Sequence, residues 1–155
     1  MTFSGDLRGR DFSGQDLSGA EFAGADLYRA QFRTACLRGA AFQDCFAAES
    51  DFSHACCAGL TAYRSSFYRA QFRGADLSGA LLRECVLAAA DLRGADLRRL
   101  TITLDCDSFE DTVLSRTAGA MLAYLFGRAR SPQRARWIHV AGEHDLEHLQ
   151  SLFGR

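Results

Sequence analysis

The residues with the clearest metal-site spacing lie near the end of the chain. Residues 144–148 match the His-x-x-Glu-His pattern of inverted zinc peptidases, in which two histidines four positions apart share a helix face. His139 is the nearest candidate for a third ligand, but Gly142 lies between, and little chain remains for a substrate cleft. A solvated helix face rich in Glu, Asp and His accounts for the same residues. We therefore expect no metal and no other cofactor.

Other catalytic motifs are missing from the sequence. It has no glycine-rich phosphate loop, no nucleophile elbow and no Ser/His/Asp arrangement, and His54 is an isolated residue. We predict that the protein is not an enzyme.

The dominant feature of the chain is an apolar residue at every fifth position over residues 7–102. Residues 75–79 (Ala-Asp-Leu-Ser-Gly) show the unit, with a small residue two before the apolar centre and an acid or amide between them. Most centres are Leu or Phe, and the small ones are Ala47, Cys57 and Ala62. Because a fixed period of this kind is the signature of a repeat architecture, it determines the fold prediction.

A period of five fits neither a helix nor an uninterrupted strand. It fits a short extended piece followed by a corner, in which the small residue and the centre point to one side and the acid or amide to the other. Repetition gives a coil with Leu, Phe and Ala inside and glycine at the corners. Stacked coils then share one continuous core.

The tandem Ala-Asp-Leu-x-Gly units resemble those of the pentapeptide-repeat family over roughly residues 5–104. The resemblance implies an all-β solenoid: a right-handed quadrilateral β-helix of about five coils, with four pentapeptides in each coil. Residues twenty apart would then stack at the strand spacing of about 4.8 Å. We predict this β-helix over residues 1–107 and a short α-helical C-terminal cap over residues 108–155.

Sorting the centres by coil predicts which side chains stack. Phe12, Phe32, Phe52 and Phe72 should form an aromatic column that ends at Leu92. The small centres cluster in the third coil, where we expect Phe46 and Leu60 to fill part of the space. In the first coil, Gly5, Arg10 and Gln15 hold the inward small position, as expected for a polar cap on an open end.

Outward positions also form ladders. Arg29, Glu49 and Arg69 would stack with alternating charge on one face, and Asp44, Arg64 and Glu84 on another. We interpret both ladders as solvated stabilising contacts.

The six cysteines lack the spacing of a metal finger. In a cytosolic protein they are most simply reduced, partly buried small residues. Cys45, Cys57 and Cys85 occupy inward positions, which favours that interpretation. Cys36 and Cys56 point outward and lie twenty residues apart, so a functional thiol pair remains the alternative there.

In the C-terminal tail, the apolar residues of Thr117–Phe126 have helical spacing before Gly127, and a last helix fits Glu143–Phe153. The tail would cover the end of the core. In some members of the family, a C-terminal helix also joins two subunits into a rod-like dimer. The candidates for such a homodimer contact are Met121, Leu125, Phe126 and Trp137.

Composition limits the class of partner. The net charge is −1 and all eighteen basic residues are arginine. Residues 1–107 carry 14 acids and 12 arginines, which leaves no basic footprint for direct nucleic-acid binding. No apolar segment reaches the roughly 18 residues of a membrane span, and no signal sequence opens the chain. We expect a cytoplasmic protein without membrane contact.

The quinolone-resistance members of the family have an acidic surface, occupy the DNA-binding saddle of DNA gyrase, and inhibit the enzyme or protect it from poisons. The resemblance therefore implies a binding protein that mimics DNA, with DNA gyrase or topoisomerase IV as partner. The candidate phosphate mimics are Asp11, Asp51 and Asp91 on one face and Asp16, Asp76 and Asp96 on the next. The net charge of −2 over residues 1–107 disfavours uniform mimicry, and Asp is also what the repeat itself uses.

The alternative is a protein–protein interaction scaffold with another partner. Tyr28, Phe46, Tyr68 and Val86 would form a contiguous outward apolar patch, which soluble monomers rarely leave bare. That patch would bind a partner protein or the C-terminal tail.

Overall fold

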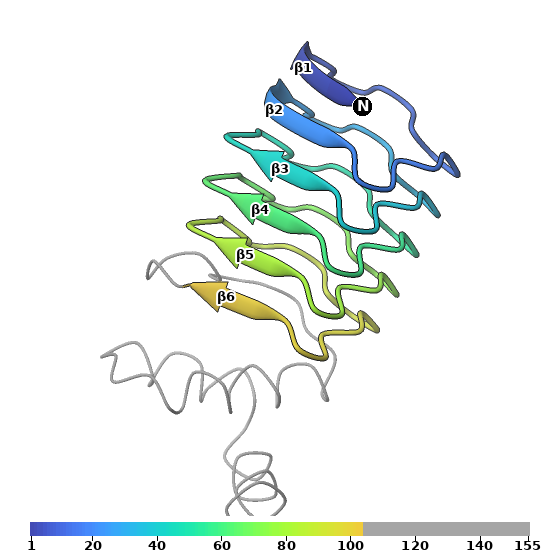
Figure 1. The fold of residues 1–155 in the computed structure, drawn as a ribbon, viewed down its shortest axis with the longest axis vertical. Helices are drawn as coiled ribbons and strands as arrows, with labels where there is room; N and C mark the ends of the chain where they lie inside the picture. The colour runs from blue at the N-terminus through green and yellow to red at the C-terminus, as the bar shows by residue number, and fades with distance from the viewer. Residues whose placement is uncertain (104–155) are drawn as a thin grey trace, which may run out of the picture. The chain divides into compact units, whose positions relative to one another are not determined.

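The computed structural model describes residues 1–103, which form one parallel sheet joined by regular corners (Figure 1). The strands are β1 (Thr2–Asp6), β2 (Glu21–Asp26), β3 (Ala41–Gln43), β4 (Thr61–Tyr63), β5 (Leu81–Arg83) and β6 (Thr101–Thr103). Each pairs with the next in chain order. From β2 onward, paired residues are twenty positions apart, as at Phe22 and Phe42. One strand per coil therefore stacks directly on the next, and we call this side the strand face.

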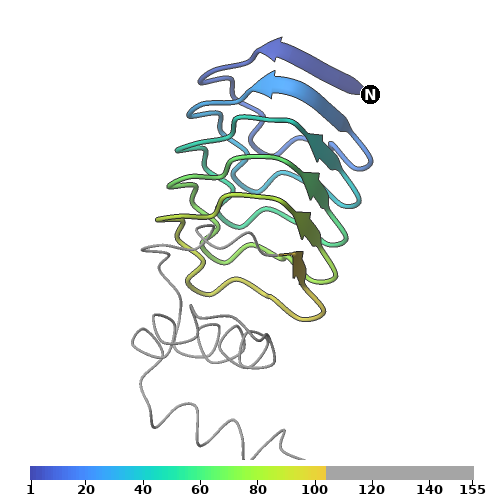
Figure 2. The same cartoon turned by 90° about the vertical axis from the view of Figure 1, so that its left-hand side faces the viewer.

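Three further ladders of paired residues run along the other sides of the coils, which are stacked in chain order (Figure 2). The glutamine face is the ladder Asp11, Gln31, Asp51, Gln71 and Asp91; the cysteine face is Asp16, Cys36, Cys56, Asp76 and Asp96; and the aromatic face is Asp26, Phe46, Ser66 and Val86, together with Tyr28 and Tyr68. Four ladders and a twenty-residue repeat confirm the predicted parallel solenoid of about five turns, of the right-handed type. The predicted boundary at residue 107 and the helical cap lie outside the described residues.

The corners differ from the sequence prediction of glycine turns. The residue two after each centre has a positive φ along the whole solenoid, but ten of these residues are not glycine, among them Arg29 (φ 57), His54 (φ 59) and Ala89 (φ 57). An L-residue in this conformation costs roughly 1–2 kcal/mol. The regular hydrogen bonds of the corner oppose that strain: at Arg29, the backbone N–H donates to the Ala48 carbonyl of the next coil at 3.0 Å.

Two columns of phenylalanines fill the core. The predicted column Phe12, Phe32, Phe52 and Phe72 is confirmed, with ring centroids 4.7–4.9 Å apart. A second column contains Phe3, Phe22 and Phe42, with centroids 4.8 Å and 4.6 Å apart.

The second column ends at Ala62, and Phe67 at the next centre along the chain fills the space. Its ring lies 6.0 Å from that of Phe42 and 5.9 Å from that of Phe52, edge to face. Leu60 is buried as expected, but the prediction that Phe46 fills this space is wrong, because 49% of Phe46 is exposed. The large side chain of Phe67 thus compensates for the small one at the preceding centre, Ala62.

The open end of the solenoid begins earlier than the repeat register indicates. Phe3 in β1 pairs with Phe22, nineteen residues later, and the register shifts to twenty at Gly5 and Ala25. Arg10 and Gln15 are exposed, as the sequence predicts for polar residues at the inward position of an open end. The Arg10 guanidinium lies over the rings of Phe3 and Phe12, at 5.9 Å and 5.0 Å, so a cation–π contact covers the first layer of the core.

Candidate binding surface

The outward aspartates first serve the corners that follow them. Each accepts a hydrogen bond from the backbone N–H two residues later, at 2.8 Å for Asp11 and Asp51. The residues that do so are Asp6, Asp11, Asp16, Asp26, Asp51, Asp76, Asp91 and Asp96. This local bond explains why the repeat places Asp directly before its apolar centre.

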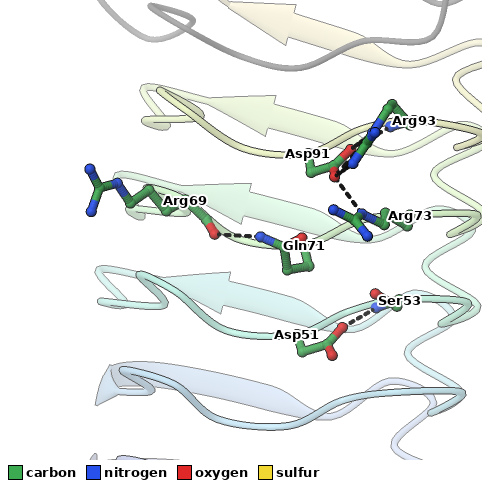
Figure 3. A network of polar contacts seen from close by, with 7 residues as sticks. All are labelled: Asp51, Ser53, Arg69, Gln71, Arg73, Asp91 and Arg93. Atoms are coloured by element: carbon green, nitrogen blue, oxygen red, sulfur yellow. Dashed lines mark hydrogen bonds and ion pairs between the residues drawn. The ribbon is translucent and has the colours of Figure 1, made fainter.

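Glutamine at the same position bonds to the backbone on its other side, as a donor to a carbonyl group that precedes it. The side-chain amide of Gln71 donates to the carbonyl oxygen of Arg69, two residues earlier, at 3.2 Å, whereas Asp51 accepts from the N–H of Ser53 (Figure 3). On the glutamine face, an aspartate therefore bonds to the corner that follows it, and a glutamine bonds to the corner that precedes it.

Three of the six candidate phosphate mimics are neutralised by arginine. Asp91 is bound by both Arg73 and Arg93, with only 6% of its side chain exposed (Figure 3). The hydrogen bonds from Arg93, and to a smaller extent from Arg73, hold the pKa of Asp91 well below its usual range. Asp51 pairs with Arg33 at 3.3 Å, and Asp96 lies against Arg98.

The other three candidates have no arginine partner of this kind among the described residues. Within residues 1–103, Asp11, Asp16 and Asp76 lie in no ion pair. Asp11 and Asp16 are exposed in the first coil, and Asp76 is half-buried. The hydroxyl and backbone N–H of Ser13 lower the pKa of Asp11, and those of Ser18 lower the pKa of Asp16. Both carboxylates are therefore charged at neutral pH.

Charge is unevenly distributed along the described residues. Residues 1–28 carry five acids and two arginines, a net charge of −3, whereas residues 29–103 carry seven acids and ten arginines, a net charge of +3. Acidic character is thus confined to the first coil and the start of the second. The predicted charge ladders are present in part, with Arg29 bound to Glu49 at 2.8 Å and Arg64 bound to Asp44 at 2.7 Å.

The aromatic face presents apolar side chains to solvent. Phe46 is 49% exposed, and Tyr68 and Val86 are each 39% exposed. Tyr28 lies 6.2 Å from Phe46 between ring centroids, and its hydroxyl donates to Glu49 at 3.2 Å. Tyr28 is half-buried, so the exposed apolar surface is centred on the other three side chains.

Sequence reasoning missed Tyr63, an aromatic residue on the strand face. It is 37% exposed beside an open depression lined by Thr61, Leu81 and Arg83, and the Arg64 guanidinium lies 4.7 Å from its ring centroid. An outward aromatic residue at a strand position was the available signal.

The five cysteines in residues 1–103 divide as the repeat register predicts. Cys45, Cys57 and Cys85 are buried, and burial raises the pKa of each thiol. Cys36 and Cys56 are half-buried free thiols on adjacent rungs of the cysteine face.

The described residues contain neither a candidate metal centre nor a candidate membrane span. Over residues 1–103, no group of three or more His, Cys, Asp or Glu side chains is arranged to hold a metal ion. The same part of the chain has no helix long and apolar enough to cross a membrane. The zinc-like motif at residues 144–148 and the dimer candidates Met121, Leu125, Phe126 and Trp137 lie outside the described residues.

Known proteins that are similar to this chain share its five-residue repeat. The family model for pentapeptide repeats matches residues 6–44 and 65–99 as eight copies. None of the curated proteins compared matches the chain. A pentapeptide repeat protein from the Arabidopsis thaliana thylakoid lumen is 31% identical over 66% of this chain and 70% of that one, with a TM-score of 0.61.

Two further solved structures are more distant. Rfr23 from the cyanobacterium Cyanothece 51142 is 25% identical over 64% of each chain, with a TM-score of 0.43. QnrB1, a plasmid-mediated fluoroquinolone resistance protein, is 22% identical over 78% of this chain and 85% of that one, with a TM-score of 0.41.

Proposed function

We propose that this chain, which belongs to the pentapeptide repeat family, is a non-enzymatic binding protein whose partner is DNA gyrase or topoisomerase IV. The observation that supports this partner is the acidic first coil, where Asp11 and Asp16 are exposed carboxylates outside any ion pair with the described residues. A topoisomerase binds the phosphates of DNA, and carboxylates at a fixed spacing present the same sign of charge.

The contact would be local. Because residues 1–28 have a net charge of −3 and residues 29–103 a net charge of +3, mimicry along the whole solenoid is disfavoured. Asp51, Asp91 and Asp96, whose charges arginines neutralise, are accordingly removed from the proposed contact. A topoisomerase partner also implies a cytoplasmic location.

A supercoiling assay with gyrase from the native host, with and without a fluoroquinolone, tests the proposal. The double variant Asp11→Asn/Asp16→Asn keeps the side-chain acceptors of both corners while removing two charges. We expect the wild type to inhibit gyrase or reduce drug-trapped cleavage, and the variant to need at least about fivefold more protein for the same effect.

The matched control is Asp96→Asn, which removes a charge already paired with Arg98. It should act like the wild type. No effect of the wild type on gyrase or on topoisomerase IV at micromolar concentration would contradict the proposal.

The second candidate is a scaffold that binds another protein through the aromatic face, supported by the exposure of Phe46, Tyr68 and Val86. The double variant Phe46→Ser/Tyr68→Ser should lose the partner, while Tyr63→Ser on the strand face should retain it. A gyrase effect that survives Phe46→Ser/Tyr68→Ser but not Asp11→Asn/Asp16→Asn would reject this candidate.

A further inference from the structure

The cysteine face replaces two consecutive aspartates with cysteines. Its ladder runs Asp16, Cys36, Cys56, Asp76 and Asp96, and Cys36 pairs directly with Cys56. The Cys56 N–H donates to Ala35 at 2.9 Å, and the Cys56 carbonyl accepts from Leu37 at 2.8 Å, so the two backbones are held side by side. Neighbouring strands lie about 4.8 Å apart, within the Cα separation of about 4.4–6.8 Å that a disulfide spans.

Polar groups surround both sulfur atoms. The Ser18 hydroxyl lies 3.0 Å from the Cys36 sulfur, and a guanidinium nitrogen of Arg38 lies 3.8 Å from the Cys56 sulfur. The Ser18 hydroxyl and the backbone N–H of Arg38 lower the pKa of the Cys36 thiol. Asp16 opposes this effect through its negative charge and by competing for the single Ser18 proton at 2.6 Å.

The adjacent Cys57 provides an internal comparison. Its side chain is fully buried at a core centre, and burial raises the pKa of its thiol. Reactive cysteines are those that favour the thiolate and reach solvent, and buried apolar ones are inert. Two cysteines one residue apart in sequence are therefore opposite in expected reactivity.

We propose that Cys36 and Cys56 form a surface dithiol that reacts with low-molecular-weight disulfides, such as glutathione disulfide, and closes to a reversible intramolecular disulfide. The proposal does not rest on the partner proposed above, although Asp16 of that contact lies on the rung next to Cys36.

The reaction proceeds in two exchanges. The Cys36 thiolate attacks one sulfur of glutathione disulfide, forms a mixed disulfide and releases a glutathione thiolate. The Cys56 thiolate then attacks the Cys36 sulfur and releases the second glutathione. The two cysteine thiols are oxidised, one glutathione disulfide is reduced to two glutathiones, and the two cysteine protons go to the released thiolates.

The solenoid keeps this disulfide easily reduced. The two side chains leave adjacent rungs in the same direction, and the ladder fixes the backbone spacing near 4.8 Å. A disulfide needs its Cβ atoms closer, at about 3.5–4.5 Å, so closure must draw the rungs together. Strained and exposed disulfides have higher reduction potentials and are the labile ones.

Thiol counting on the full-length chain tests the proposal. The reduced protein is incubated with glutathione disulfide, denatured and labelled with N-ethylmaleimide, and its mass is measured. With six cysteines in the chain, we expect six labels before oxidation and four after, with a Cys36–Cys56 cross-link in the peptide map. Dithiothreitol should restore six labels.

Three variants define the site. Cys36→Ser and Cys56→Ser should each stop at a mixed disulfide with glutathione, whereas Cys57→Ala should still close. The proposal would be overturned by a wild type that keeps six labels, that stops at mixed disulfides, or whose cross-link joins other cysteines or two chains.

Discussion

Among single residues, the outward aspartates have a structural role before any binding role. Each caps its own corner through a backbone N–H, and Asp91 is also held by Arg73 and Arg93. With 6% of its side chain exposed, Asp91 is available to those arginines rather than to a partner. An aspartate at this repeat position therefore indicates a corner. A binding role also requires that no arginine forms an ion pair with its carboxylate.

We predict that Asp91→Asn lowers the free energy of unfolding by about 1.5–3 kcal/mol at pH 7, the usual contribution of a hydrogen bond to a charged group. Because Arg93 and Arg73 depress the folded pKa of Asp91, its stabilisation is complete above the unfolded pKa of about 3.9 and is lost as pH falls through the folded value. The difference from wild type should thus be constant between pH 7 and pH 5 and shrink below pH 4. Urea unfolding at each pH measures it, and a difference that grew on acidification would contradict the assigned contacts.

Among structural elements, the corner determines the backbone geometry of the coil. The residue two after each centre has a positive φ whether it is Gly79 (φ 65) or Ala89 (φ 57). Coil stacking imposes this conformation, since ten non-glycine residues adopt it despite its intrinsic cost. Glycine is favoured at this position but is not required.

Two neighbouring alanines test the corner directly. We predict that Ala89→Gly raises the free energy of unfolding by about 0.5–1 kcal/mol, because it relieves a left-handed alanine. Ala88→Gly, one residue earlier and without a positive φ, should lower it by a similar amount through added freedom of the unfolded chain. Thermal and urea unfolding compare the two, and equal effects of the same sign would refute this account.

The repeat period predicted those elements that depend on residues twenty apart. The aromatic column from Phe12 to Phe72 and the Arg64–Asp44 pair follow directly from it. It missed Phe3, because the first coil is one residue shorter and no five-residue rule contains that shift.

The period also cannot predict contacts that depend on side-chain size or rotamer. Phe67 reaches across to Phe42 because Ala62 leaves room, and Arg93 turns back onto Asp91 at the same corner. For the candidate site, the sequence identified six aspartates, but the rotamers of Arg33, Arg73, Arg93 and Arg98 decide which of them lie outside an ion pair.

At the scale of the whole solenoid, each coil contacts its neighbours through the same four ladders. Removing one complete coil should therefore preserve the stacking, whereas removing a few residues fewer should disturb it.

We predict that excision of residues 71–90, which joins Ala70 to Asp91, leaves a folded, shorter solenoid. Excision of residues 71–88 puts the later residues out of register by two positions. The first variant should melt at least about 5 °C above the second, corresponding to about 1 kcal/mol for a domain of this size. Circular dichroism on heating measures both, and equal midpoints would show that the twenty-residue register is not required.

The hydrogen bonds between coils also determine how the solenoid responds to force applied along the direction in which the coils stack. The Leu27 N–H donates to Phe46 and the Phe46 N–H donates to Ala25, so each coil is joined to the next along the direction of stacking. Tension applied between the first and last described coils loads these interfaces in series, and force opens them one at a time rather than shearing all of them together. The interface where Phe42 faces Ala62 lacks the ring stacking that joins Phe22 to Phe42 in the same column. Under load, the protein would lengthen in steps of one coil, with an early step at that interface.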